Sequence, residues 1–153
     1  MRQRGFTLLE ILAVLVLIGV ALAATAFSLD GGLQRAKLDA SARDIAASLR
    51  HTRTLALTSH RPQWFTLDLK ARTYASPGRD AQSIPLGTTL RATSAAEDAD
   101  KPGIARIRFF PDGSSTGGHI ELARQHRQAR IDVDWLTGAV ATSETAAREK
   151  QNH

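Results

Sequence analysis

The chain has 153 residues, of which 42% are hydrophobic, and its 20 lysines and arginines exceed its 15 aspartates and glutamates to give a formal net charge of +5. It contains no cysteine, which excludes disulfides and zinc–thiolate sites. The excess of positive charge is mild and does not by itself mark a nucleic-acid-binding protein.

The chain begins with a basic leader followed by a long apolar run. Arg2 and Arg4 lie in the leader, and residues 6–27 are almost all apolar except for one carboxylate, Glu10. A helix over this run would be about 33 Å long, enough to cross a hydrocarbon core of about 30 Å. The two arginines predict that the N-terminus stays in the cytoplasm.

Two ordinary interpretations of this run compete with a specialised one. A secretory signal peptide would be cut at a small-residue site such as Ala21–Ala23 or Ala24–Ala26. A plain membrane anchor would stay uncut. Glu10 argues against both, because an ionisable group inside a membrane helix is costly and points to a function.

The start of the chain resembles the N-terminal motif of type IV pilins and type II secretion pseudopilins, in the run Gly5-Phe6-Thr7-Leu8-Leu9-Glu10. In that family a prepilin peptidase cuts after the glycine and methylates the new amine. The resemblance implies cleavage between Gly5 and Phe6, N-methylation of Phe6 and a role for Glu10 in assembly. It also implies the prepilin peptidase, the inner membrane and, through the N-terminal helix, other major and minor pseudopilins as partners.

The spacing of Phe6 and Glu10 suits that role. They are four residues apart, so they lie on one face of a helix. After cleavage Phe6 carries a cationic amine, and methylation keeps the charge. A buried carboxylate needs a partner, and in a filament the amine of a neighbouring subunit can supply it. Glu10 would then set the register of assembly, as buried polar residues do in coiled coils.

The next segment predicts a second helical half. Gly31 and Gly32 follow Asp30, and glycine weakens a helix interior by about 1 kcal/mol, so we expect a kink or short break there. Helical periodicity then resumes as a narrow stripe, which predicts packing against a sheet: Leu38, Ala42, Ile45, Leu49, Thr52 and Ala56. The helix should end near His60, because Pro62 restricts the residue before it.

After Pro62 the period of the apolar residues changes from 3.6 to 2, which predicts antiparallel strands. We expect strands at 64–69, 73–75, 84–86, 89–93, 104–109, 120–122, 129–135 and 139–141. In the strand at 129–135 the alternation places Trp135 on the same face as Ala129, Ile131 and Val133.

The predicted fold is α+β and pilin-like: a long N-terminal transmembrane helix followed by a small antiparallel β domain with two packed sheets. The domains are a prepilin leader (1–5), a transmembrane helical half (6–29), a periplasmic helical half (30–60) and the β domain (61–142). From residue 143 no apolar pattern recurs, so 143–153 is predicted to be a disordered tail.

The second half of the chain resembles H-type minor pseudopilins and the related FimT-like minor pilins. The resemblance lies in Ile107–Ile120, which contains Phe110-Pro111-Asp112-Gly113, in Val133–Gly138 and in Leu49–Ala56. It implies a minor pseudopilin that helps export folded proteins across the outer membrane, with the C-terminal domain in the periplasm. The alternative is a FimT-like minor type IV pilin acting in pilus assembly or DNA uptake.

Catalytic and metal sites are not predicted. The five histidines have no metal-ligand spacing, and Ser114-Ser115 lacks the G-x-S-x-G elbow of hydrolases. We therefore predict no enzyme activity and no cofactor. Glu97, Asp98 and Asp100 make calcium binding by the 94–103 loop a weak alternative.

Charged residues near the end of the chain have two interpretations. Arg124, Arg127 and Arg130, with His126, are candidate DNA contacts if the chain is FimT-like. They are otherwise the solvated side chains of a hairpin, which we favour because few aromatic residues lie nearby to stack on bases. Asp132 and Asp134 are read as the solvent side of a strand.

Overall fold

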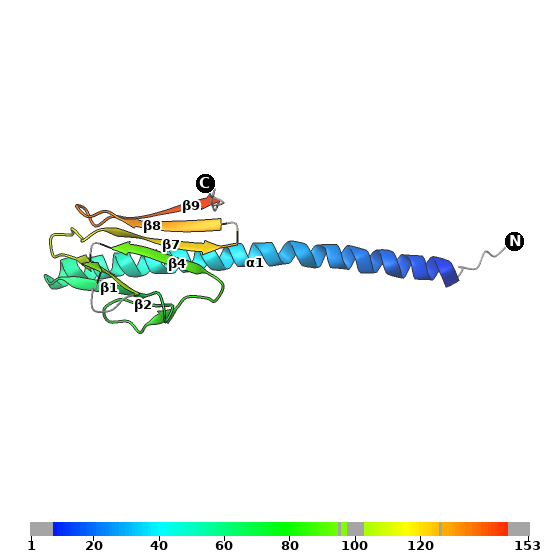
Figure 1. Cartoon of the computed structure of the whole chain (residues 1–153), viewed down its shortest axis with the longest axis horizontal. Coiled ribbons are helices and arrows are strands. Elements are labelled where there is room, and N and C mark those ends of the chain that lie inside the picture. The colour runs from blue at the N-terminus through cyan, green and yellow to red at the C-terminus, as the bar shows by residue number, and fades with distance from the viewer. Residues whose placement is uncertain (1–7, 95, 98–102, 126, 147–153) are drawn as a thin grey trace. The chain divides into compact units, whose positions relative to one another are not determined.

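The computed structural model describes residues 8–94, 96–97, 103–125 and 127–146. One helix, α1, runs from Leu8 to Ser59 and has 52 residues (Figure 1). It is continuous through Asp30–Gly32, so of the kink or short break expected there, the break is wrong: two glycines cost about 2 kcal/mol, which does not interrupt a helix of this length. Its end before His60 is as predicted. Among the described residues, no helix has the length and apolar character needed to span a membrane.

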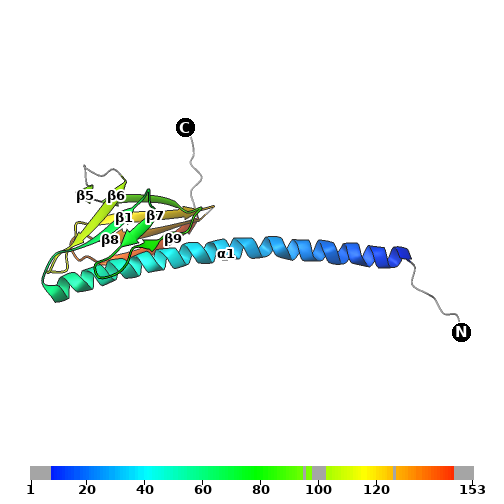
Figure 2. The ribbon, with the colours of Figure 1, turned by 90° about the horizontal axis from the view of Figure 1, so that it is seen from below.

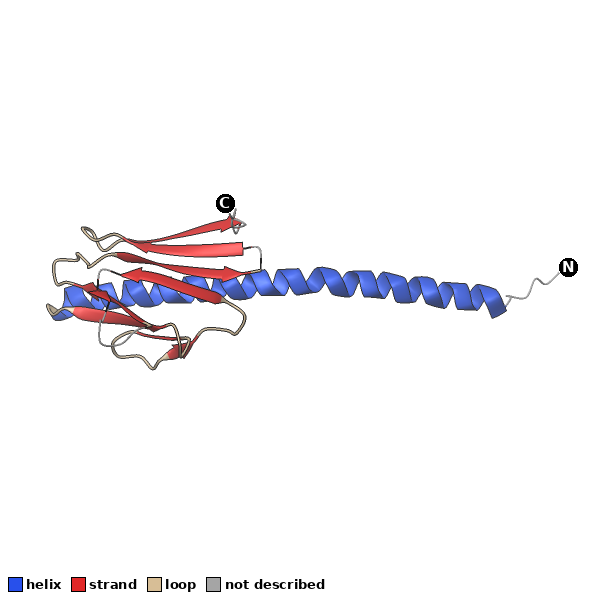
Figure 3. Cartoon of the chain, viewed as in Figure 1, coloured by secondary structure: helices blue, strands red, loops and turns tan. Residues whose placement is uncertain are grey.

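The chain forms two compact units, residues 1–34 and residues 35–153. The second unit contains the rest of α1 and two antiparallel sheets (Figure 3). One sheet has the strand order β3-β2-β1-β6-β5 and the other β4-β7-β8-β9, which confirms the two predicted sheets. The strands are β1 Gln63–Asp68, β2 Thr73–Ala75, β3 Gln82–Ser83, β4 Thr89–Ser94, β5 Ala96–Glu97, β6 Ile104–Phe109, β7 Gly118–Arg124, β8 Arg127–Val133 and β9 Val140–Ala146.

The core of the second unit lies between α1 and the two sheets, and Figure 2 shows both sheets on one side of this part of the helix. All six residues of the predicted helical stripe are buried, which confirms the stripe. The sheets contribute alternate residues of their strands, namely Phe65, Leu67, Ile107, Phe109, Ile120, Leu122, Ala129, Ile131 and Val133. Each buried Leu, Ile or Phe side chain stabilises the unit by about 1.5–3 kcal/mol.

The strands predicted at 84–86 and 129–135 differ from the structure. The strand expected at 84–86 is replaced by β3, two residues earlier. Ile84 is still buried, but its N–H donates to the carbonyl of Arg72 (2.8 Å) outside the ladder. β8 ends at Val133, so Trp135 does not continue its buried face and is 66% exposed.

The predicted disordered tail is wrong for its first four residues. β9 runs from Val140 to Ala146 and pairs with β8 along its whole length, ending at the pair Arg127 and Ala146. Val140 packs against the core, but the residues that follow it in β9 have little apolar character, so hydrogen bonding to β8 accounts for the rest of this strand. Residues 147–153 lie outside the described residues.

Candidate functional site

The first candidate site is the start of α1. Glu10 lies in its first turn and is exposed. It stands among eleven large apolar side chains that are all exposed: Leu8, Leu9, Ile11, Leu12, Val14, Leu15, Val16, Leu17, Ile18, Val20 and Leu22. So large an apolar surface marks contact with a membrane or with other proteins. Gly5 and Phe6, the predicted cleavage and methylation positions, lie outside the described residues.

A second region of interest is the loop between β6 and β7. The Asp112 carboxylate accepts hydrogen bonds from the N–H and the hydroxyl of Ser114, at 2.9 and 2.6 Å. These bonds hold the pKa of Asp112 below its ordinary value. The Gly113 carbonyl accepts a hydrogen bond from Nε of Arg53 on α1 (3.2 Å), so the loop is tied to the helix.

The turn between β8 and β9 packs onto that loop. The Asp134 carboxylate accepts hydrogen bonds from the N–H of Thr137 (2.7 Å), its hydroxyl (2.8 Å) and the N–H of Leu136 (3.1 Å). These bonds, those from Thr137 foremost, lower the pKa of Asp134. Ser115 donates from its N–H to the carbonyl of Trp135 and from its hydroxyl to the carbonyl of Asp134. The turn is thus held rigidly and presents Trp135 and Leu136 to solvent.

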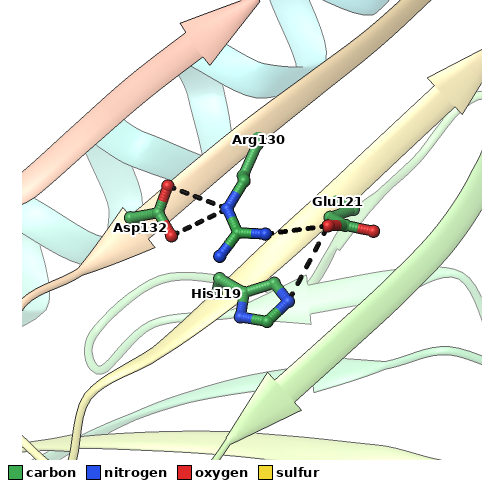
Figure 4. A network of polar contacts seen from close by, with 4 residues as sticks. All are labelled: His119, Glu121, Arg130 and Asp132. Carbon is green, nitrogen blue, oxygen red and sulfur yellow. Dashed lines mark hydrogen bonds and ion pairs between the residues drawn. The ribbon is translucent and has the colours of Figure 1, made fainter. Parts of the chain in front are cut away.

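The third region is a charged network on the outer face of the four-stranded sheet (Figure 4). Arg130 donates from Nε to both carboxylate oxygens of Asp132 (2.9 and 3.0 Å) and from Nη1 to Glu121 (3.0 Å). Nε2 of His119 lies 3.8 Å from the same Glu121 oxygen. Arg130 is therefore neutralised by two carboxylates.

The predicted basic cluster is divided between the two faces of this sheet. Arg124 and Arg127 are cross-strand partners, and Arg130 is opposite Glu121. Because side chains alternate along a strand, Arg130 lies on the opposite face from Arg127. Arg124 donates to the carbonyl of Leu86 (2.9 Å), and Arg127 is exposed. His126 lies outside the described residues.

Asp132 and Asp134 do not share the strand face on which the sequence placed them, because β8 ends at Val133. Asp132 pairs with Arg130, whereas Asp134 caps the following turn. Within the described ranges, no group of three or more His, Asp or Glu side chains is placed to hold a metal ion. Asp98 and Asp100, the core of the suggested calcium loop, lie outside those ranges.

A comparison with solved structures identifies the fold. The structure of the minor pseudopilin EpsH from the type II secretion system of Vibrio cholerae matches with a TM-score of 0.56 at 13% identity, covering 74% of this chain and 99% of EpsH. The type IV minor pilin FimU of Pseudomonas aeruginosa matches with a TM-score of 0.54 at 12% identity, covering 72% and 90%. The chain therefore has the pilin-like fold that the sequence predicted.

The sequence comparisons show the family. The model of the family "Type II transport protein GspH" matches residues 41–138, and that of the prokaryotic N-terminal methylation motif matches residues 1–26. The type II secretion system protein H of Xanthomonas campestris pv. campestris is 39% identical over 137 residues, covering 90% of this chain and 81% of that protein. The chain belongs to the GspH family and is a minor pseudopilin of type II secretion, which confirms the resemblance.

Proposed function

We propose that this minor pseudopilin is anchored in the inner membrane by residues 6–29, with its N-terminus cytoplasmic and its second unit in the periplasm. Exposed apolar side chains from Leu8 to Leu22 support the anchor, since lipid or neighbouring helices would cover them. The match to the methylation motif over residues 1–26 supports processing after Gly5 and methylation of Phe6.

In this account the chain is an assembly subunit and not an enzyme. It joins other major and minor pseudopilins through the N-terminal helix and helps export folded proteins across the outer membrane. Glu10 lies exposed among apolar side chains, where it can meet the methylated amine of a neighbouring subunit. This one carboxylate in an apolar helical surface, inside the methylation motif, is the observation that carries the proposal.

The proposal is tested by complementation in a strain that lacks this gene. Wild-type chain should restore secretion of a folded exoprotein, whereas Gly5→Val should remain uncut and fail to do so. Gly5 has no side chain, which suits a peptidase pocket that accepts only the smallest residue. Full secretion with uncut Gly5→Val would contradict the proposal.

The alternative, a DNA-binding minor pilin, has weaker support. Phosphate binding needs available positive charge, and Arg130 is already paired with two carboxylates. Neutralising Arg124, Arg127 and Arg130 together is expected to leave secretion largely intact. If the purified protein binds DNA at physiological salt and this variant does not, the alternative is favoured instead.

A further inference from the structure

Three side chains gather on the outer face of the five-stranded sheet, opposite the core. Trp64 in β1 and Arg108 in β6 are cross-strand partners. Their chain neighbours Phe65, Ile107 and Phe109 are buried, so alternation places Trp64 and Arg108 on the other face. Phe110, which follows β6, lies close to the same arginine.

The aromatic rings fix the guanidinium of Arg108. Its Cζ lies 3.8 Å from the centroid of the Trp64 ring and 5.8 Å from that of Phe110. Both distances are within the range of cation–π attraction. The Nε of Arg108 is buried and has no hydrogen-bond acceptor among the described residues. The charged group is thus held in one orientation and partly removed from water.

The Nε of Arg72 is also buried without an acceptor, but the other half-buried arginines of the described residues, Arg72 included, use a guanidinium nitrogen differently from Arg108. Four of them donate hydrogen bonds to oxygen: Arg53, Arg72, Arg124 and Arg130. A fifth, Arg106, also has an interaction. Unlike Arg53, Arg72, Arg124 and Arg130, the guanidinium of Arg108 has neither a hydrogen bond nor an ion pair within the described residues.

A cross-strand cation–π pair would explain the stacking by itself. It does not explain why the Arg108 guanidinium has no hydrogen-bond acceptor for its buried Nε. Leaving a buried donor unpaired costs free energy of folding. Arginine matches a carboxylate with two parallel hydrogen bonds, and surrounding aromatic rings strengthen them by excluding water. Trp and Arg are also the residues enriched at the energetic centres of protein interfaces.

We propose that Arg108, held by Trp64 and flanked by Phe110, binds a side-chain carboxylate from the globular domain of a neighbouring pseudopilin. The inference rests on the proposed function, which supplies the class of partner. A protein carboxylate is favoured over nucleic acid because the guanidinium already covers a face of the Trp64 ring, the surface on which a base would stack. The stacking also orients the guanidinium in advance, which lowers the entropy lost on binding.

The test uses the full chain in cells that carry the whole secretion system. A photo-crosslinking phenylalanine analogue replaces Thr66, which lies two residues from Trp64 on the same face. We expect a crosslink to another pseudopilin, detected with antibodies to each subunit. Arg108→Gln should weaken it about tenfold or more, as expected for loss of a charge-assisted hydrogen bond. Arg108→Lys should fall between, since it keeps the charge but not the planar fork.

Arg91→Gln is the matched control, because it removes an exposed arginine from β4 of the other sheet and should leave the crosslink unchanged. Arg108→Asp should abolish the crosslink. Combining it with a partner whose acidic residue at the crosslinked site is replaced by arginine should restore the crosslink. Such a rescue would not occur if Arg108→Asp had simply failed to fold. An unchanged crosslink in Arg108→Gln, or crosslinks only to an exoprotein or to DNA, would overturn the inference. Cleavage after Gly5 is followed in the same cells, so that failure of the proposed function is seen separately.

Discussion

Gly138 and the carbonyl of Gly113 are in contact so close that no side chain fits between them. A Cβ on Gly138 would lie 2.2 Å from the Gly113 oxygen and 3.0 Å from Nε of Arg53. The φ of Gly138 is +62°, a region that glycine adopts readily. This contact joins the turn after β8 to the loop after β6 and to α1.

We predict that Gly138→Ala destabilises the protein strongly. Gly78→Ala is the control, because Gly78 has a similar φ of +73° but open space around its missing Cβ. The control should cost about 1–2 kcal/mol from the left-handed backbone alone. Gly138→Ala should cost at least about 2 kcal/mol more, because the backbone itself must shift. Unfolding midpoints of the two full-length variants in detergent check this; equal midpoints would contradict the packing described here.

The second unit should fold without the first. Removing residues 1–30 leaves the buried stripe of α1 from Leu38 to Ala56 and both sheets intact. We predict a soluble, β-rich protein that melts cooperatively, measured by circular dichroism. A random-coil spectrum or aggregation would show that the sheets depend on the N-terminal half of α1 or on a partner.

Stability should fall in acid through Asp112 and Asp134. Hydrogen bonds lower the pKa of both carboxylates in the folded protein below the ordinary 3.8. The unfolded chain therefore binds protons at a higher pH. The stability that these hydrogen bonds add is complete above pH 3.8 and is lost as the pH falls through the lower pKa values of the folded protein.

Unfolding midpoints measured between about pH 7 and pH 2.5 test this linkage. Asp134→Asn keeps an acceptor oxygen but cannot titrate, so it should reduce the loss of stability at the acid end. Asp80→Asn, which removes an exposed aspartate after the turn at 77–78, is the control for the loss of one surface carboxylate. Identical acid profiles for wild type and Asp134→Asn would show that the hydrogen bonds to Asp134 add nothing to stability.

Glu10→Val tests the assembly role of the N-terminal helix. The variant should enter the membrane at least as well as wild type, because it removes a charge from an apolar segment. It should still be cut after Gly5, since the cleavage site is unchanged. Incorporation into the pseudopilus and secretion should both fail. Glu10→Asp should be partly defective, because its shorter side chain keeps the charge but holds it farther from the amine of the neighbouring subunit. Cysteine crosslinking between subunits, with secretion measured in the same cells, decides this. Full crosslinking by Glu10→Val would show that the Glu10 carboxylate has no role in assembly.

The sequence predicted the helices and strands in which apolar residues recur with the spacing of the side chains that face the core. The helical stripe from Leu38 to Ala56 and the strands around Phe65 and Ile107 follow directly from which residues become buried. Trp135 was predicted wrongly because its place in the alternation suggested a buried strand residue. The Asp134 carboxylate instead accepts hydrogen bonds from the backbone N–H groups of Leu136 and Thr137, which stabilises a turn.

Features that depend on backbone hydrogen bonds, or on contacts between residues far apart in the chain, leave little pattern in the sequence. β9 extends to Ala146 through its ladder with β8, although its residues show no apolar periodicity. The separation of Arg130 from Arg127 depends on the register of β7 and β8, which charge counting along the sequence does not provide. The stacking of Arg108 on Trp64 likewise joins residues 44 positions apart, and only the pairing of β1 with β6 brings them together.

Mass spectrometry of the N-terminal peptide tests most directly whether this chain is processed as a pseudopilin. The protein is extracted from the membranes of cells that contain the prepilin peptidase. We predict a mature chain that begins with N-methylated Phe6. A chain that begins at Ala24 or Phe27, as after signal-peptide cleavage, or one that keeps Met1, would contradict it.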